Sequence, residues 1–269
     1  MLGRKALAFV RRDLLIESSY KFAFVLELLA SVFPVVSLYF VGKLVGGQGA
    51  QSLERYGGQY FPFAMVGIAV TQYFTLALAT FANTIRRSQM AGCLEAMLNT
   101  RTAPQTLVIL SSLYSFVAKT VHVALVFLVG TVWLGADLSR ANWGGAGVVL
   151  ILTILTFSSL GIFSAALIVV LKKGDPIEWI FGSVSALVGG ALFPVAVMPA
   201  WMQTLATLLP ITYSLDGMRL AVLQGAPLAA LWKEIAVLAA MAAVLLPVSV
   251  LAFSRAVEKG RRDGSLMHY

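Results

Sequence analysis

Three titratable side chains lie inside long apolar segments of this sequence, where they could contact a bound molecule. Glu27 is near the start of the first such segment, and Lys119 and His122 are near the middle of the third. Ionisable groups are costly in hydrocarbon, so those that occur there commonly serve a function. We expect Glu27, Lys119 and His122 either to lie along a substrate path or to form structural pairs. A lysine can also extend its ammonium group to the membrane surface.

The sequence offers little material for metal, redox or nucleotide chemistry. Its two histidines, His122 and His268, are far apart, and Cys93 is the only cysteine. No pair therefore has the spacing of metal ligands, and no disulfide can form within the chain. A Gly-rich phosphate loop ending in Gly-Lys-Ser or Gly-Lys-Thr is absent. We expect no cofactor or metal in this chain, so ATP chemistry would need another protein.

One kind of enzyme is conceivable, an intramembrane serine hydrolase. Its motif would be Ser158, Ser159 and Gly161, with a serine as the nucleophile and His122 as the base. Small polar residues in membrane helices, however, mostly make packing contacts. An enzyme should also show polar residues clustered toward one cavity, and in this sequence they are scattered.

The segments that carry these residues have the composition of membrane helices. Of the 269 residues, 59% are hydrophobic and 12% are charged, and the mean hydropathy is +0.87, which excludes an ordinary soluble domain. In hydrocarbon each backbone amide must be bonded within the protein, and the alternating pattern of a barrel strand is absent. The expected fold class is therefore all-α.

The lengths of the apolar segments predict a single transmembrane domain over residues 1–269 with six membrane-spanning helices. A helix needs about 20 apolar residues to cross the hydrocarbon layer. The predicted spans are Phe22–Val45, Phe61–Asn83, Thr106–Leu134, Gly145–Leu171, Trp179–Val197 and Leu228–Phe253.

Three segments outside the spans complete this domain. Residues 1–21 combine apolar residues at helical spacing with basic ones, which predicts an interfacial helix on the membrane surface or, alternatively, a solvated helix. Residues 198–227 are too apolar for a solvated loop and too interrupted by prolines for one helix. We expect a re-entrant or surface-lying hairpin there, on the outer side, with helical pieces Trp201–Leu209 and Tyr213–Leu223. Residues 254–269 form the expected cytoplasmic tail.

The distribution of basic residues predicts the orientation of the chain. The N-terminal segment, the second loop, the fourth loop and the C-terminus hold five, three, two and four Lys or Arg residues, whereas the opposite face holds five in total. Cytoplasmic loops carry the excess of Lys and Arg. Both termini are therefore expected in the cytoplasm, with the chain in the inner membrane and in contact with lipid. The formal charge of +8 thus indicates topology rather than nucleic-acid binding.

The segment between the second and third spans is the most informative cytoplasmic one. After Arg86 and Arg87, the residues 89–98 predict a short amphipathic helix with Met90, Leu94 and Met97 toward one side. A short helix on the cytoplasmic face is a surface on which a soluble motor domain could push. The spacing alone is also compatible with a plain connecting loop.

Residues 92–98, Gly-Cys-Leu-Glu-Ala-Met-Leu, followed by Thr102 and Pro104, resemble the Gly-Thr-Leu-Glu-Ala-Leu-Leu...Thr-Pro segment of type-2 ABC exporter permeases, the drug and polysaccharide export family. Cys93 stands where Thr is usual. In that family the segment is a coupling helix seated in a groove of the ATPase subunit. The coupling residues that the resemblance implies are Gln89, Met90, Gly92, Leu94, Glu95 and Met97.

A second match follows the fifth predicted span and resembles the family's Phe-Pro...Pro...Leu-Pro-x-Thr/Ser-Tyr pattern with a later acid and Arg. We expect Asp216 and Arg219, three residues apart on one helical face, to form a structural ion pair. The matching residues of this outer hairpin are Pro194, Pro199, Pro210, Tyr213, Asp216 and Arg219.

The resemblance covers essentially the whole chain and implies a permease subunit of an ATP-driven exporter. Its expected partners are two copies of a separate ABC ATPase, which would bind ATP and Mg²⁺, and a second permease copy, identical or related. The expected substrate is hydrophobic or amphipathic: a drug, a lipid or a lipid-linked polysaccharide. Gly182, Ala186 and Gly190, four residues apart, form a small-residue stripe that is a candidate dimer seam or an intramolecular packing surface. The alternatives are a polytopic membrane enzyme and a channel or assembly factor.

Overall fold

The computed structural model describes residues 7–12, 14–15, 21–45, 50–90, 104–171, 181–182, 184–185 and 188–262. Throughout these ranges the regular elements are helices, and no strand occurs, so the predicted all-α class is confirmed. The helices are α2 (Lys21–Val45), α3 (Ala50–Leu53), α4 (Tyr60–Met90), α6 (Pro104–Val132), α7 (Trp143–Leu171), α9 (Ala200–Leu208), α10 (Pro210–Gln224) and α11 (Trp232–Arg262), with 3-10 turns η2 (Glu54–Tyr56) and η3 (Val195–Val197).

Four helices in the described part of the chain are long and apolar enough to cross a membrane. They are the segments Tyr60–Arg86, Ser112–Val132, Trp143–Val170 and Trp232–Gly260 of α4, α6, α7 and α11. The α2 helix contains a shorter apolar stretch, Leu29–Leu44. The expected first span thus coincides with a helix, but its crossing of the membrane stays a prediction.

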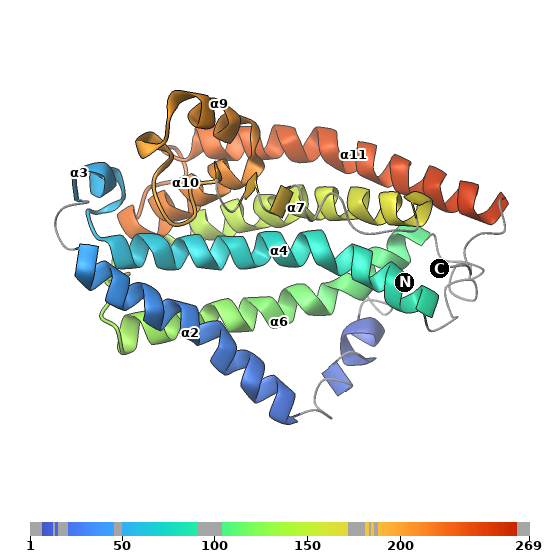
Figure 1. Cartoon of the computed structure of the whole chain (residues 1–269), viewed down its shortest axis with the longest axis horizontal. Helices are drawn as coiled ribbons and strands as arrows, with labels where there is room; N and C mark the ends of the chain where they lie inside the picture. Colours follow the sequence, from blue (N-terminus) through green and yellow to red (C-terminus); the bar gives the residue numbers. More distant parts are fainter. Residues whose placement is uncertain are drawn as a thin grey trace.

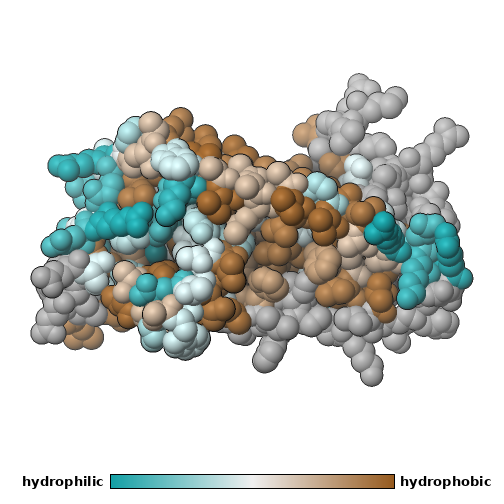
Figure 2. All heavy atoms as spheres, turned by 90° about the horizontal axis from the view of Figure 1, so that it is seen from above, coloured by the Kyte–Doolittle hydropathy of each residue, from teal (hydrophilic) through white to brown (hydrophobic). Residues whose placement is uncertain are grey.

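The four long helices lie side by side along the long axis of the molecule (Figure 1). The short helices α3, α9 and α10 gather at one end of this bundle, and the C-terminal ends of α4 and α11 lie at the other (Figure 1). The α2 helix crosses α4 and α6 obliquely and diverges from them toward its N-terminal end. Figure 2 shows mainly apolar residues along the middle of one face and hydrophilic residues at its two ends, as expected of a membrane protein.

The α4 helix is the centre of the bundle because it contacts α7, α6, α10 and α2. Its buried side includes Phe74 and Phe81. The ring of Phe74 meets Phe157 of α7 edge to face at 4.8 Å between centroids, and the ring of Phe81 lies 6.4 Å from that of Phe116 of α6. Such ring pairs stabilise the packing of the long helices against one another. Packing contacts matter here because lipid provides no hydrophobic driving force between helices.

A glycine allows α7 to approach α4 closely. A Cβ atom at Gly161 would overlap the backbone carbonyl oxygen of Ala77, which cannot rotate away. We expect Gly161→Ala to lower the free energy of unfolding in detergent by about 1–3 kcal/mol, because an inserted methyl group forces the helices apart. The matched control is Gly147→Ala in the same helix, where a Cβ would meet nothing within 4 Å. It should leave stability unchanged or raised by up to about 1 kcal/mol; equal losses in both variants would contradict this account of the packing.

The predicted spans two, three, four and six correspond to α4, α6, α7 and α11, and the largest differences are at two C-terminal ends. The α4 helix continues seven residues beyond the predicted end at Asn83, to Met90, and α11 continues nine beyond Phe253, to Arg262. These extensions carry Arg86, Arg87, Arg255 and several further charged residues. A helix need not end where its hydrocarbon-spanning part ends, so the apolar segments predicted both helices too short.

The fifth predicted span, Trp179–Val197, was wrong at its C-terminal end. The described residues 181–182, 184–185 and 188 are helical, but the chain leaves the helix at Gly189. Gly190 has φ +82°, in the left-handed region that favours glycine, and Pro194 is extended ahead of η3. Gly190 therefore does not continue a helical stripe from Gly182.

The segment in which we expected the outer hairpin contains two short helices, and its place on the outer side stays a prediction. The α9 and α10 helices occupy the predicted pieces within one to three residues, and Pro199 and Pro210 stand at their N-cap and first position. Asn142, which caps the start of α7 by accepting from the Gly145 amide, donates its side-chain amide to the Ala226 carbonyl at 2.9 Å. The hairpin is thus tied to the bundle rather than free.

Candidate functional site

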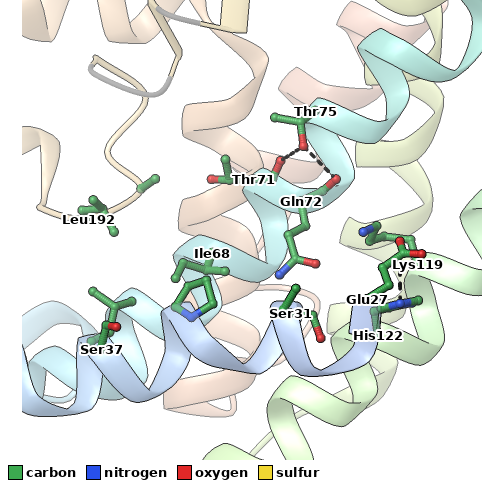
Figure 3. A pocket seen from close by; sticks show the side chains of 14 residues that line it. Glu27, Ser31, Ser37, Ile68, Thr71, Gln72, Thr75, Lys119, His122 and Leu192 are labelled. Atoms are coloured by element: carbon green, nitrogen blue, oxygen red, sulfur yellow. Dashed lines mark hydrogen bonds and ion pairs between the residues drawn. The ribbon is translucent and has the colours of Figure 1, made fainter. Parts of the chain in front are cut away.

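A cavity of about 670 Å³ lies between α2, α4 and α6 (Figure 3). Its wall is mainly apolar, but all three titratable residues singled out from the sequence contribute to it. The lining residues are Glu27, Ala30, Ser31, Pro34, Ser37 and Leu38 of α2, Ile68, Thr71, Gln72 and Thr75 of α4, Lys119 and His122 of α6, and Ala191 and Leu192.

Glu27 and His122 join α2 to α6 across this cavity. The Glu27 Oε1 atom lies 3.8 Å from His122 Nε2, and the His122 side chain is 2% exposed whereas that of Glu27 is 55% exposed. The other ring nitrogen, Nδ1, lies 2.8 Å from the Ala118 carbonyl oxygen. A carbonyl can only accept, so Nδ1 carries a proton and Nε2 is the nitrogen that faces the carboxylate. The pair becomes a salt bridge when Nε2 is also protonated.

Two other polar groups face the cavity without a partner in the described part of the chain. The half-buried Lys119 ammonium forms neither a hydrogen bond nor an ion pair there, although Glu27 lines the same cavity. The Oε1 atom of Gln72 is buried and accepts no hydrogen bond from any described residue. Figure 3 shows the Gln72 side chain extending from α4 toward α2. Unsatisfied polar atoms at such depth are costly, so they point to a bound molecule or water.

A buried arginine anchors the outer hairpin next to this cavity. The Arg219 side chain on α10 is 1% exposed, and its guanidinium donates to three carbonyl oxygens: Gly190 at 2.8 Å, Ala191 at 2.6 Å and Phe63 at 3.3 Å. It also lies 3.5 Å from the centroid of the Phe63 ring. Burial lowers the pKa of Arg219 to about 10, so it stays charged at neutral pH.

The expected ion pair between Asp216 and Arg219 is not formed. Instead, the Asp216 carboxylate accepts a hydrogen bond from the Tyr56 hydroxyl at 2.6 Å, and Tyr56 stands before α4 in the sequence. Burial, together with the neighbouring carboxylate, raises the pKa of Tyr56, which keeps it a donor. The Arg219 guanidinium instead bonds carbonyls within the fifth predicted span and near the start of α4, and it lies 5.7 Å from the centroid of the Tyr56 ring. The two charged residues therefore join different elements to the hairpin.

The anchor and the cavity share a turn of the chain. Arg219 holds the carbonyls of Gly190 and Ala191, and Ala191 and Leu192 line the cavity. Gly67 of α4 makes this approach possible, because a Cβ at that position would overlap the Ala191 carbonyl oxygen. Hydrogen bonds of Arg219 thus link α10 directly to the cavity wall.

The family model of the ABC-2 type transporter matches residues 6–223. The chain belongs to this family. Comparison with curated proteins found no match. As an ABC-2 type permease with several membrane-capable helices, the chain is a multi-pass membrane transport subunit, and its family associates with an ABC ATPase.

Ser159, one of the two serines considered for an enzyme, bonds within its own helix. The Ser159 hydroxyl donates to the Leu155 carbonyl one turn earlier at 2.8 Å, and Gly161 is the point of contact with α4. His122 instead lies at the cavity on α6.

The remaining predicted sites are placed only in part. Gln89 and Met90 are the last residues of α4, and Gly92, Leu94, Glu95 and Met97 lie outside the described residues, so the coupling helix stays a prediction. Ala186 of the candidate dimer seam is also outside them. A Cβ at Gly182 would meet nothing within 4 Å, and Tyr213 joins the two helices of the hairpin by donating to the Thr207 carbonyl at 2.9 Å.

Proposed function

We propose that this chain forms one half of the substrate pathway of an ATP-driven exporter. Two copies, or this chain and a related one, would enclose the pathway, and two separate ATPase subunits would bind ATP and Mg²⁺. The substrate would be hydrophobic or amphipathic: a drug, a lipid or a lipid-linked polysaccharide. The observation that carries this proposal is the cavity between α2, α4 and α6. In a chain of the ABC-2 family, a mainly apolar cavity lined by three ionisable groups is suited to bind a transported molecule.

The proposed topology has six spans, with both termini in the cytoplasm and the chain in the inner membrane. The basic residues support this orientation, and the ends of α4 and α11 lie together, away from the outer hairpin. The α2 helix and the segment before Gly189 would be spans one and five. ATP-driven movement at residues 89–98 would enter the bundle through α4, which continues directly into that segment.

Blocking the cavity tests the proposal. The permease is purified from its native membrane with whatever ATPase accompanies it, reconstituted in liposomes, and assayed for ATP hydrolysis stimulated by hydrophobic amines, lipids and lipid-linked glycans. Thr71→Trp places a large ring in the cavity and should lower both the stimulation and transport by at least about tenfold, while basal hydrolysis continues.

The matched control is Val117→Trp, which adds the same ring on α6 at a position that is 50% exposed and does not line the cavity. It should retain the activity of the unmodified permease within a factor of about two. If no ATPase copurifies, the exporter proposal fails. If both tryptophan variants behave alike, the cavity is not the pathway.

A further inference from the structure

The charges in the cavity suggest the chemistry of the molecule that it holds, an inference that rests on the proposed role of the cavity. Glu27 and Lys119 have opposite charges and line the same space, but they form no ion pair with each other. Opposite charges in an apolar site normally gain by pairing directly. Lys119 is therefore not neutralised by Glu27 among the described residues, and both charges remain available to a molecule in the cavity.

The position of each group gives the cavity a polar wall on either side. Glu27 is more than half exposed on α2, whereas His122 is almost fully buried on α6 and faces the Glu27 carboxylate. Lys119 lies one turn before His122 on α6. The buried Gln72 Oε1 of α4 adds an acceptor that lacks a donor among the described residues. Acceptors thus lie on α2 and α4, and the unpaired cation lies on α6.

A ligand with a single charge would be attracted by one of these two groups and repelled by the other. An anion would pair with Lys119 but be repelled by Glu27, and a cation would pair with Glu27 and be repelled by Lys119. Lys119 is half-buried, so leaving its charge uncompensated carries a desolvation cost, whereas Glu27 is more than half exposed and contributes a weaker attraction or repulsion. A ligand with one cationic and one anionic group compensates both, and its cationic group is also attracted by the Gln72 amide oxygen.

We propose that the cavity binds an amphipathic zwitterion, a molecule with an apolar chain and a head group that carries an ammonium and an acidic group. The apolar part of the wall, with residues such as Pro34, Leu38 and Ile68, receives the chain. The acidic group pairs with Lys119, and the ammonium group lies between Glu27 and Gln72. Zwitterionic membrane lipids have this chemistry.

Photolabelling with matched probes tests the assignment. Four probes share one alkyl chain with a diazirine and differ in the head group, which is phosphocholine, phosphate, trimethylammonium or glycerol. They are added to the purified permease in nanodiscs, with its ATPase where one accompanies it, and labelled peptides are located by mass spectrometry. The phosphocholine probe should label the cavity segments of α2, α4 and α6 at least about fivefold more than each other probe.

Single substitutions should change which head group is preferred, and a folding defect could not produce such a change. Lys119→Met leaves Glu27 unopposed, so the trimethylammonium probe should become the best. Glu27→Gln leaves the positive charge of Lys119 unopposed, so the phosphate probe should become the one that labels most strongly. Lys233→Met, on the exposed first turn of α11, is the control and should keep the original order.

Equal labelling by all four probes in the unmodified permease would overturn the proposal, since the charges would then be structural. Preference for phosphate alone would overturn it in favour of an anion site made by Lys119 and His122, and preference for trimethylammonium alone would leave Glu27 as the only recognising charge. The assay needs no ATP hydrolysis. A correct labelling pattern without a copurifying ATPase would therefore refute the exporter role and not the zwitterion site.

Discussion

Replacing Arg219 by Met should destabilise the permease by about 3–5 kcal/mol, because it leaves buried carbonyl oxygens without their donor. Methionine fills most of the volume of arginine but cannot donate to Gly190, Ala191 and Phe63, all of which Arg219 bonds now. Denaturation in mixed micelles, in which a denaturing detergent gradually replaces a mild one, measures the loss. The stability of Arg219→Lys should lie between that of the unmodified permease and that of Arg219→Met, because one ammonium cannot reach three carbonyls with the geometry of a planar guanidinium.

The control for this prediction is Arg262→Met near the end of α11. Arg262 is 77% exposed and pairs with Glu258 one helical turn away. Such an exposed pair contributes only about 0.3–0.5 kcal/mol. If Arg219→Met were no more destabilising than Arg262→Met, the hairpin would be held by the packing of α10 alone and the arginine anchor would be refuted.

The long helices could be predicted from the sequence because their signal is simple. A run of about 20 apolar residues has few alternatives in hydrocarbon, and α4, α6, α7 and α11 are where such runs occur. The same signal misled at Gly190, because apolar residues such as Leu192 and Phe193 continue past the point where the helix ends. The two adjacent glycines and Pro194 were the local indication of a turn.

The cavity could be predicted only through its charged members. Glu27, Lys119 and His122 stood out because ionisable residues are rare in apolar segments. Gln72 did not stand out, since an uncharged polar residue in a span is ordinary and its missing partner is visible only in three dimensions. Polar residues at Thr71 and Thr75, one turn apart, were a weak sign of a polar face on α4.

The contacts of Asp216 and Arg219 could not be predicted from the sequence, for a different reason. The Asp216 carboxylate and the Tyr56 hydroxyl that bonds it are 160 residues apart, and Arg219 bonds to backbone carbonyls, which every residue possesses. Spacing of three residues on a helix favours an ion pair only when no better partner is near. Here Tyr56 bonds the Asp216 carboxylate, and Arg219 bonds three carbonyl oxygens and lies over the Phe63 ring.

Changing the charges of the predicted coupling helix should abolish transport while the membrane domain stays folded. The double variant Leu94→Asp and Glu95→Arg places a charge on the apolar side of residues 89–98 and inverts the one on the other side. Burial of an unpaired charge in an interface costs several kcal/mol, so ATPase association should weaken by at least about a hundredfold. Association is measured by copurification and by binding of the separated ATPase to permease in nanodiscs, alongside transport.

The outcome depends on the continuity between this segment and α4. Because α4 runs without a break from the cavity residues Gln72 and Thr75 to Met90, a force applied just beyond Met90 acts on the helix that forms one cavity wall. Glu258→Arg is the control, a reversal of an exposed charge on the C-terminal extension of α11. It should retain association and transport, because α11 contributes no residue to the cavity. If the double variant also retained both, the ATPase would have to push elsewhere, and residues 89–98 would be a plain connecting loop.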